Sequence, residues 1–379
     1  MWYWRYPFYR FEMAIGSGCN MRCKFCFEKD GGYKDSSLTY DQLDWWAGYM
    51  KHMHDKAGVA IQSGIYGGEP LLYMDKVLYH AETIAPFAKM LMLSSNGLLV
   101  QKYAAELKEL YRMFDTFFVN VSYNYALQNE TRQEGTYDAV RDAIRFLCSE
   151  LGWGVSSTVV LTADTLHRVD EVFDDFYALY KETGGRNRVQ INYNAGLAGW
   201  DLADEKAARE ALSRVRGKML KHPELQNGSF MYNWIGGRRG HRRCDCLFAF
   251  VRAALCADGS VMPGYDALYS NEFTRDLMRL GTAGDDFVDV DKRIDYLIKN
   301  LHANPPAQCR SCESQCRLLP WRTVVDSADQ YNAMPHPDRC RAIQMFYDQI
   351  PWGRDDMTYE QHLEFEKNFS QSVKGGCHG

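Results

Sequence analysis

The pattern of apolar and polar positions along residues 10–222 predicts strands that alternate with helices. Short apolar or β-branched runs, typical of buried strands, lie near 11–16, 58–65, 90–95, 116–122, 155–161 and 188–193. This alternation predicts an α/β fold with a parallel sheet, which could be doubly wound or barrel-like. In either case, ligands would bind in the loops that follow the carboxyl ends of the strands.

Three helices stand out between these runs. Thr39 and Gln42 have the spacing of a capping box at the start of the first helix. Apolar residues follow it at helical spacing, namely Leu43, Trp46, Ala47 and Met50. A second stripe consists of Val140, Ala143, Ile144 and Leu147. A third helix is expected at about 201–222.

The bulk composition is that of an ordinary globular protein, with 46% hydrophobic and 25% charged residues in a chain of 379. The net charge of −5 gives no indication of a nucleic-acid partner. The sequence contains no apolar run of about 18 residues and no secretory signal at its start, so we expect a cytoplasmic protein without a membrane partner. The aromatic fraction, 14%, could fill a large core or line a groove for an extended substrate.

The character of the chain changes near residue 235, where a segment rich in glycine and arginine precedes a region rich in cysteine. We therefore expect three parts: residues 1–235, a smaller metal-organised domain at 236–345, and a tail at 346–379 with a helix around 358–369.

Cysteine is the unusual feature, with 12 residues in a chain expected to stay reduced. Disulfides are rare in the cytosol, so metal or redox chemistry is the better interpretation. Three cysteines lie within 19–26 and eight within 244–377, whereas Cys148 is isolated on an amphipathic helix and is expected to be a core thiol.

Cys19, Cys23 and Cys26 have the spacing C-x3-C-x2-C directly after the first expected strand. Three thiolates on one tight loop can bind three irons of a [4Fe–4S] cubane and leave the fourth iron open to a small molecule. A zinc site is the main alternative, although structural zinc needs four ligands.

This motif, with Phe25 before its last cysteine, resembles that of the radical S-adenosylmethionine (radical SAM) superfamily. The resemblance implies a partial (β/α)6 TIM-like barrel. It also implies that the methionine part of S-adenosylmethionine binds the open iron and that its reductive cleavage gives a 5′-deoxyadenosyl radical, which abstracts hydrogen from a substrate. The electron would come from an external donor such as flavodoxin or ferredoxin.

Further residues match the cofactor-binding positions of that family. The loop after the second expected strand, Tyr66-Gly67-Gly68-Glu69-Pro70, resembles the segment that binds the methionine amino group. The resemblance also implies cofactor contacts from Ser95, Asn96, Ser122 and Arg132, with the serine at 122 on the ribose and the arginine on the carboxylate. An ordinary turn at 94–97 and a surface arginine at 132 are the alternatives. Relatives often have aspartate where this chain has Asn124.

The later cysteines resemble the extension called SPASM, which usually holds two auxiliary [4Fe–4S] clusters. Cys256 begins the segment CADGSVMP, similar to the glycine-containing hairpin of that extension, but Gly264 replaces the cysteine expected next. We expect one or two auxiliary clusters, with a zinc site as the alternative. The candidate ligands are Cys244, Cys246, Cys256, Cys309, Cys312, Cys316 and Cys340. Cys377 could close an open site.

The layout is similar to that of anaerobic sulfatase-maturating enzymes and ribosomal-peptide maturases. We therefore expect a peptide or protein substrate and a thioether or other crosslink as product. A separate protein could recruit the substrate. Formylglycine formation, peptide epimerisation and small-molecule dehydrogenation remain open, with Asp266 as a candidate base. A non-catalytic iron–sulfur or zinc scaffold is the alternative from another class, but it would not need the segment at 66–70.

Overall fold

The computed structural model of the chain describes residues 8–26, 36–162, 164–193, 202–222, 224–225, 230–232, 251–264, 276 and 278–303. Ten strands are present in this part of the chain: β1 (Phe8–Ala14), β2 (Ala60–Tyr66), β3 (Ala88–Ser95), β4 (Thr116–Ser122), β5 (Val155–Leu161), β6 (Asn187–Tyr193), β7 (Phe230–Tyr232), β8 (Val251–Leu255), β9 (Ser260–Met262) and β10 (Gly281–Thr282).

The helices of the same part are α1 (Tyr40–Ala57), α2 (Met74–Ile84), α3 (Ala104–Met113), α4 (Gln128–Thr131), α5 (Tyr137–Arg145), α6 (Val169–Glu182), α7 (Leu202–Met219) and α10 (Phe287–Ala303). The expected capping box is confirmed, because the Thr39 side chain accepts from the Gln42 N–H and the Gln42 side chain accepts from the Thr39 N–H. None of the helices in the described residues is long and apolar enough to cross a membrane.

All ten strands join one sheet in the order β10-β9-β8-β1-β2-β3-β4-β5-β6-β7. The neighbouring strands along the stretch β8-β1-β2-β3-β4-β5-β6-β7 are all parallel. The β8–β9 and β9–β10 pairs are antiparallel. The first six strands are therefore adjacent in sequence order. Within the described residues the sheet does not close, and the expected α/β architecture with a partial barrel is confirmed.

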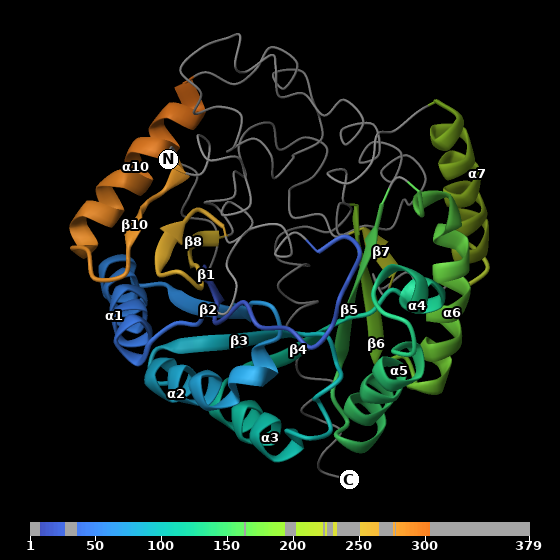
Figure 1. Cartoon of the computed structure of the whole chain (residues 1–379), viewed down its shortest axis with the longest axis horizontal. Coiled ribbons are helices and arrows are strands. Elements are labelled where there is room, and N and C mark those ends of the chain that lie inside the picture. The colour runs from blue at the N-terminus through green and yellow to red at the C-terminus, as the bar shows by residue number, and fades with distance from the viewer. Residues whose placement is uncertain are drawn as a thin grey trace.

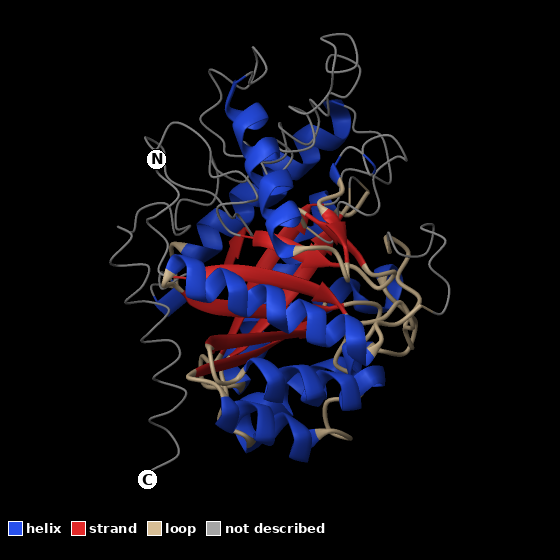
Figure 2. Cartoon of the chain, turned by 90° about the vertical axis from the view of Figure 1, so that its left-hand side faces the viewer, coloured by secondary structure: helices blue, strands red, loops and turns tan. Residues whose placement is uncertain are grey.

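The sheet has a helix-covered outer face and an inner face. Figure 1 shows α1, α2, α3, α5 and α6 following one another along the outer side of the curved sheet, and Figure 2 shows the strands at the centre of the molecule between helices. Phe11 of β1 packs edge-on against Trp46 and Tyr49 of α1, with ring centroids 5.6 and 6.0 Å apart. Neighbouring positions along a strand face opposite sides, so Glu12 and its register partner Gly64 face inward.

Some strand ends differ from expectation, most informatively those of β1 and β2. β1 ends at Ala14 rather than near 16, because the chain turns there into the loop that carries the cysteines. β2 starts at Ala60, two residues later than expected, because Gly58 caps α1 with φ +65°. Only glycine adopts this left-handed conformation at little cost, and α1 therefore ends there.

The segment after residue 250 extends the same sheet. β8 pairs with β1, and the β8–β9 hairpin contains Gly259 at φ +83°. α10 lies beside α1, where Tyr49 Oη donates to Asp291 Oδ1 at 2.9 Å and Trp45 Nε1 donates to the Asp285 carbonyl at 2.9 Å. The expected hairpin is confirmed. The division into three parts stays a prediction, because most of 236–379 lies outside the described residues.

Candidate active site

The cysteine loop, residues 16–26, follows β1 and is fixed by the loop after β2. The Gly68 N–H donates to the Gly16 carbonyl and the Glu69 N–H to the Gly18 carbonyl, both at 2.8 Å. These contacts join two backbone segments directly. The position of the cysteines therefore depends on the loop expected to bind the cofactor.

Glycine is required where these two loops meet. A Cβ atom on Gly68 would lie 2.3 Å from the Gly18 carbonyl oxygen, and one on Gly67 would lie 2.4 Å from the Gly16 carbonyl oxygen. Gly67 also has φ +140°. No side chain of any size fits without separating the loops. The two glycines thus permit close approach to the cysteine loop, in addition to any role toward a ligand.

Tyr73 is a contact of the cysteine loop that sequence reasoning missed. Its hydroxyl accepts from the Gly18 N–H at 3.0 Å. A Cβ atom on Gly16 would lie only 2.5 Å from the Tyr73 ring, so the ring fills the space beside that glycine. Tyr73 lies in the 3-10 turn Pro70–Tyr73 that follows the glycines. No pattern in the sequence marks it, because its role depends on the tertiary contact.

Glu69 is fully buried and links the loops after β2 and β3. Its Oε1 accepts from Ser95 Oγ at 2.8 Å and the Leu71 N–H at 3.1 Å, and its Oε2 accepts from the Asn96 N–H at 2.6 Å. Burial raises the pKa of this carboxyl from 4.5 to about 7, and the three hydrogen bonds lower it only in part. A carboxylate has about four acceptor sites, so one site on Oε2 remains for a further donor.

Asn96 connects the third strand to the cysteines. Its Nδ2 lies 3.8 Å from Cys19 Sγ and donates to Asn20 Oδ1 at 2.6 Å. Its Oδ1 accepts from the Leu98 N–H at 3.1 Å, as in an Asx turn. The segment is therefore a strand-ending turn that also contacts the first cysteine.

Arg132 approaches the cysteine loop from the opposite side. The alternative of a surface arginine is wrong, because the residue is only 6% exposed. Its Nη1 lies 3.7 Å from Cys23 Sγ, and its guanidinium lies over the Phe25 ring at 5.0 Å. Burial lowers the pKa of Arg132, and the nearby thiols raise it in part.

The loop after β4 and helix α4 hold the far side of the cysteine loop. The Lys24 N–H donates to the Thr131 carbonyl at 2.9 Å, and the Arg22 N–H donates to Gln133 Oε1 at 3.0 Å. The cysteines thus lie between the loops of β2 and β3 on one side and those of β4 on the other.

The remaining expected cofactor residues lie on the inner side of the sheet. Ser122 ends β4 half-buried, and its hydroxyl forms no hydrogen bond within the described residues. The Tyr66 hydroxyl accepts from Arg10 and donates to Glu12 Oε1 at 3.3 Å.

The surroundings of the three cysteines disfavour a free thiolate at Cys19. Burial, together with the charges of Glu69 and Cys23, raises the pKa of Cys19 to about 11. A metal must therefore displace its proton to hold the thiolate. Among the described residues, no three His, Cys, Asp or Glu side chains converge on a single metal ion. A cubane does not require this, because each thiolate binds a different iron.

Other expected residues have mixed outcomes. Cys148 is fully buried in the hydrophobic core, which confirms the expectation of a core thiol. Cys256 is also fully buried, at the start of the β8–β9 hairpin, where its N–H donates to the Ser260 carbonyl at 2.8 Å. The other candidates lie outside the described residues: Cys244, Cys246, Asp266, Cys309, Cys312, Cys316, Cys340 and Cys377.

Comparison with known proteins supports the interpretation of the cysteine loop. The model of the radical SAM superfamily matches residues 13–176, which include the cysteines, Glu69 and Arg132. No curated protein matches the chain.

Solved structures show the same fold at low sequence identity. The chain is similar to a polyhistidine-tagged anSMEcpe with bound AdoMet, with 17% identity, a TM-score of 0.63, and coverage of 98% of this chain and 100% of that chain. It is also similar to native anSMEcpe with bound AdoMet and Kp18Cys peptide, with 16% identity, a TM-score of 0.61, and coverage of 96% and 100%.

A further similar structure is Streptococcus suis SuiB bound to precursor peptide SuiA, with 16% identity, a TM-score of 0.57, and coverage of 83% of this chain and 70% of that chain. At such identities the likeness establishes the fold alone. The match to the radical SAM superfamily model thus spans residues 13–176, and the likeness to the solved structures supports an open, partial TIM-barrel sheet.

Proposed function

We propose that this chain is a radical SAM enzyme that modifies a peptide or protein substrate, as a ribosomal-peptide maturase that forms a thioether or other crosslink. The observation that carries the proposal is the meeting of Cys19, Cys23 and Cys26 with Glu69 on one side and Arg132 on the other. The cluster and S-adenosylmethionine, when bound, would supply a 5′-deoxyadenosyl radical that removes hydrogen from the substrate.

The residues around the cysteines can each take a part in holding the cofactor. The guanidinium of Arg132 has five N–H groups, and three of them point to Asn124, Cys23 and the Thr158 carbonyl. Two N–H groups, one on each terminal nitrogen, remain for the carboxylate of the cofactor. Ser122 offers its hydroxyl to the ribose, and the backbone of residues 67–69 with Glu69 Oε2 offers acceptors to the amino group.

The inner face of the sheet supports a polar substrate. Asn120 Nδ2 donates to Ser94 Oγ at 3.2 Å, and Thr158 Oγ1 donates to Asn120 Oδ1 at 2.9 Å. Because hydroxyl and carbonyl oxygens have more than one acceptor site, these polar groups would have capacity left for hydrogen bonds with a peptide. Two structures of the same fold, anSMEcpe and SuiB, hold peptides.

The other parts of the proposal concern the cysteine-rich region and the partners. One or two auxiliary [4Fe–4S] clusters would lie in a domain at 236–345, with Cys256 as one ligand, and would accept the electron released as the crosslink forms. A flavodoxin or ferredoxin would supply the electron that starts each turnover, and a separate protein could present the peptide.

Cofactor cleavage is the first test. The full chain, reconstituted anaerobically with iron and sulfide and reduced with dithionite, is incubated with S-adenosylmethionine, and 5′-deoxyadenosine is measured. We expect formation well above that of Cys23→Ala. Equal, background levels from both proteins would contradict the proposal and favour a scaffold.

The substrate is tested by co-expression with any short peptide that is encoded beside the gene. A crosslink removes two hydrogen atoms from the peptide, so mass spectrometry should show that loss within one linked fragment. An unchanged mass with an inverted residue would indicate an epimerase instead, and an unmodified peptide would contradict a maturase role.

A further inference from the structure

Two N–H groups point at two of the three cysteine sulfurs. Arg132 Nη1 lies 3.7 Å from Cys23 Sγ, and Asn96 Nδ2 lies 3.8 Å from Cys19 Sγ. Both distances are typical of N–H···S hydrogen bonds, and both residues are only 6% exposed. The two donors come from different loops, after β3 and after β4, and reach the cysteine loop from opposite sides.

Arg132 is held by neutral groups, so its charge is directed at the sulfurs. Its Nε donates to Asn124 Oδ1 at 3.1 Å and its Nη2 to the Thr158 carbonyl at 3.2 Å. No carboxylate pairs with Arg132 within the part of the chain that the structure describes. The groups that favour its charged form most are the thiols of Cys23, Cys26 and Cys19.

Asn124 is itself fixed, which keeps the guanidinium in place. Its Nδ2 donates to Thr131 Oγ1 and to the Val160 carbonyl, both at 2.8 Å, and its Oδ1 also accepts from the Val160 N–H at 3.0 Å. An aspartate at this position would bring a negative charge to the same side of the guanidinium. The neutral amide positions Arg132 without neutralising it.

These contacts bear on reduction of a cluster held by the three thiolates. One electron from a low-potential donor makes the cluster more negative by one charge, and no bond forms or breaks. Hydrogen bonds to cluster sulfurs and a buried positive charge both stabilise the more negative state. The effect is large at a buried site because the local dielectric constant is low.

We propose that Arg132 and Asn96 are positioning residues that make the cluster on Cys19, Cys23 and Cys26 easier to reduce, through N–H···S hydrogen bonds to Cys23 and Cys19. The proposal rests on the proposed function, because it requires the cluster. It gives Arg132 a second role, since the same guanidinium would contact a cluster ligand and the cofactor carboxylate.

The test is a redox titration of the reconstituted full chain without S-adenosylmethionine, followed by electron paramagnetic resonance. The signal of this cluster is identified as the one missing from Cys23→Ala. The variants are Arg132→Gln, Arg132→Lys and Asn96→Ser. Serine at 96 is neutral and can still accept from the Leu98 N–H, but it cannot reach Cys19. Arg168→Gln is the control, because Arg168 pairs with Glu130 and Glu171 away from the cysteines.

We expect Arg132→Gln to lower the equilibrium constant for reduction by about tenfold, which is about 59 mV for a one-electron couple. Arg132→Lys keeps the charge and should lower the midpoint reduction potential less than Arg132→Gln does. Asn96→Ser should also lower it by a smaller amount. Arg168→Gln should leave it unchanged. If Arg132→Gln does not retain iron, Arg132→Lys and Asn96→Ser decide the matter.

The proposal would be overturned if the midpoint reduction potentials of these variants equalled those of wild type and the control, even where 5′-deoxyadenosine is still formed. Conversely, a wild-type chain that holds the cluster but forms no 5′-deoxyadenosine would contradict the proposed function, whereas the midpoints would still decide the role of Arg132 and Asn96.

Discussion

The loops around the cysteines and the layer formed by α5 and α6 both contain buried charged side chains, but different atoms hold them together. Around the cysteines, backbone N–H and carbonyl groups make the main contacts, such as those from Gly68 to Gly16 and from Glu69 to Gly18. The charged groups there, Glu69 and Arg132, have uncharged partners or thiols.

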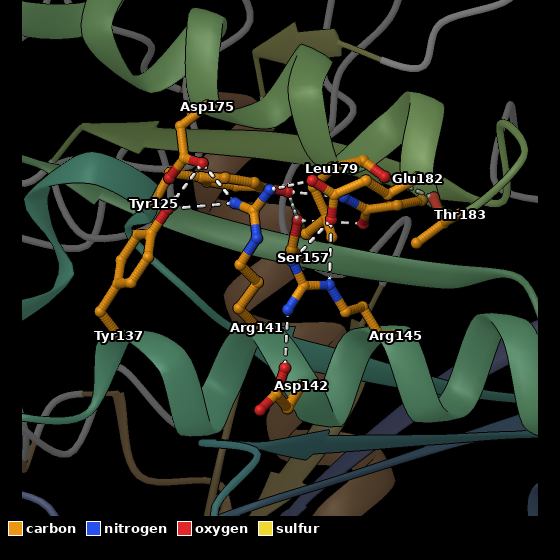
Figure 3. Close-up of polar contacts among 11 residues, drawn as sticks. Tyr125, Tyr137, Arg141, Asp142, Arg145, Ser157, Asp175, Leu179, Glu182 and Thr183 are labelled. Carbon is orange, nitrogen blue, oxygen red and sulfur yellow. Dashed lines mark hydrogen bonds and ion pairs between the residues drawn. The ribbon is translucent and has the colours of Figure 1, made fainter.

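The helical layer is instead held by pairs of charged side chains. Arg141 of α5 donates to Asp175 and, at 2.8 Å, to Glu182 Oε1, both on α6. Arg145 also donates to Glu182, through Nη2 at 2.8 Å. Figure 3 shows these side chains between the two helices, with Tyr137 beside Asp175.

The two kinds of contact should differ in how well they tolerate amino-acid substitution. Long charged side chains can move and find new partners, so the helical layer should lose stability by degrees when it is altered. Contacts between backbone segments leave no room for an added methyl group. The cysteine loop should therefore fail completely after small changes. Four matched pairs of substitutions test this contrast.

The largest effect is expected from removing cysteines. Cys23→Ala removes one of three cluster ligands and should abolish the cluster and 5′-deoxyadenosine formation. Cys148→Ala, in the helical layer after α5, removes only a buried thiol and should cost about 1 kcal/mol of stability with the cluster intact. Iron and sulfide content and the visible absorption of both proteins check this. Cluster loss in Cys148→Ala would break the contrast.

A single methyl group gives the next largest effect. In Gly68→Ala the Cβ would lie 2.3 Å from the Gly18 carbonyl oxygen, so the loops must separate. We expect most of the iron to be lost, at a cost above about 4 kcal/mol for the docked loop. Gly217→Ala in α7 has open space around its Cβ and should be neutral or stabilising. The readouts are iron content and the thermal midpoint, and a Gly68→Ala protein with full iron content would show that the loop tolerates expansion.

The helical layer should lose stability without losing the cluster. Arg141→Met leaves Asp175, whose side chain is 12% exposed, without its charged partner. The expected cost is about 3–5 kcal/mol, as for a broken buried ion pair. Arg145→Gln, with a side chain 43% exposed, should cost less than about 1 kcal/mol. Urea unfolding measures both. Loss of iron from folded Arg141→Met would show that the two regions are coupled.

The same contrast explains how far the sequence could predict the molecule. The six strands of the barrel were found within a few residues because buried parallel strands are nearly continuous apolar runs. β4 and β5 match the expected 116–122 and 155–161 completely. The cysteine loop and the segment at 66–70 could be placed because both are compact motifs at strand ends.

Other features of the site were not predictable because they depend on loops distant in sequence. Tyr73 meets Gly18, and Asn124 orients Arg132, only after the sheet has formed. Tyr125 adopts φ +53°, and its hydroxyl accepts from Asn187 Nδ2 at 2.8 Å. Local propensity opposes this conformation, so no local pattern could indicate it.

The smallest effect, and the most specific, is a difference in the sign of pH dependence between the buried Glu69 and the exposed Glu182. Burial raises the pKa of Glu69 from 4.5 to about 7, so the folded state binds more protons than the unfolded state between these values. The free energy of unfolding should therefore fall as pH rises from about 4.5 to about 7. Arg145 and Arg141 lower the pKa of Glu182 despite an opposing effect of burial, so its contribution is present at neutral pH and is lost as pH falls below 4.5.

Glu69→Gln should remove the fall in the free energy of unfolding between about pH 4.5 and 7, which is at most about 3 kcal/mol. Glu182→Gln should instead remove only the loss of stability below about pH 4.5. Urea unfolding of both variants and wild type at pH values from about 3 to 8 measures the two differences, and subtraction from wild type cancels the other titrating groups. Slopes of the same sign for both variants would contradict the contrast, because Glu69 would then be stabilised by its hydrogen bonds more than it is destabilised by burial. Opposite slopes would show that the cysteine site contains a carboxylate retained at a cost in stability, as expected if Glu69 is needed to join the loops rather than to stabilise the fold.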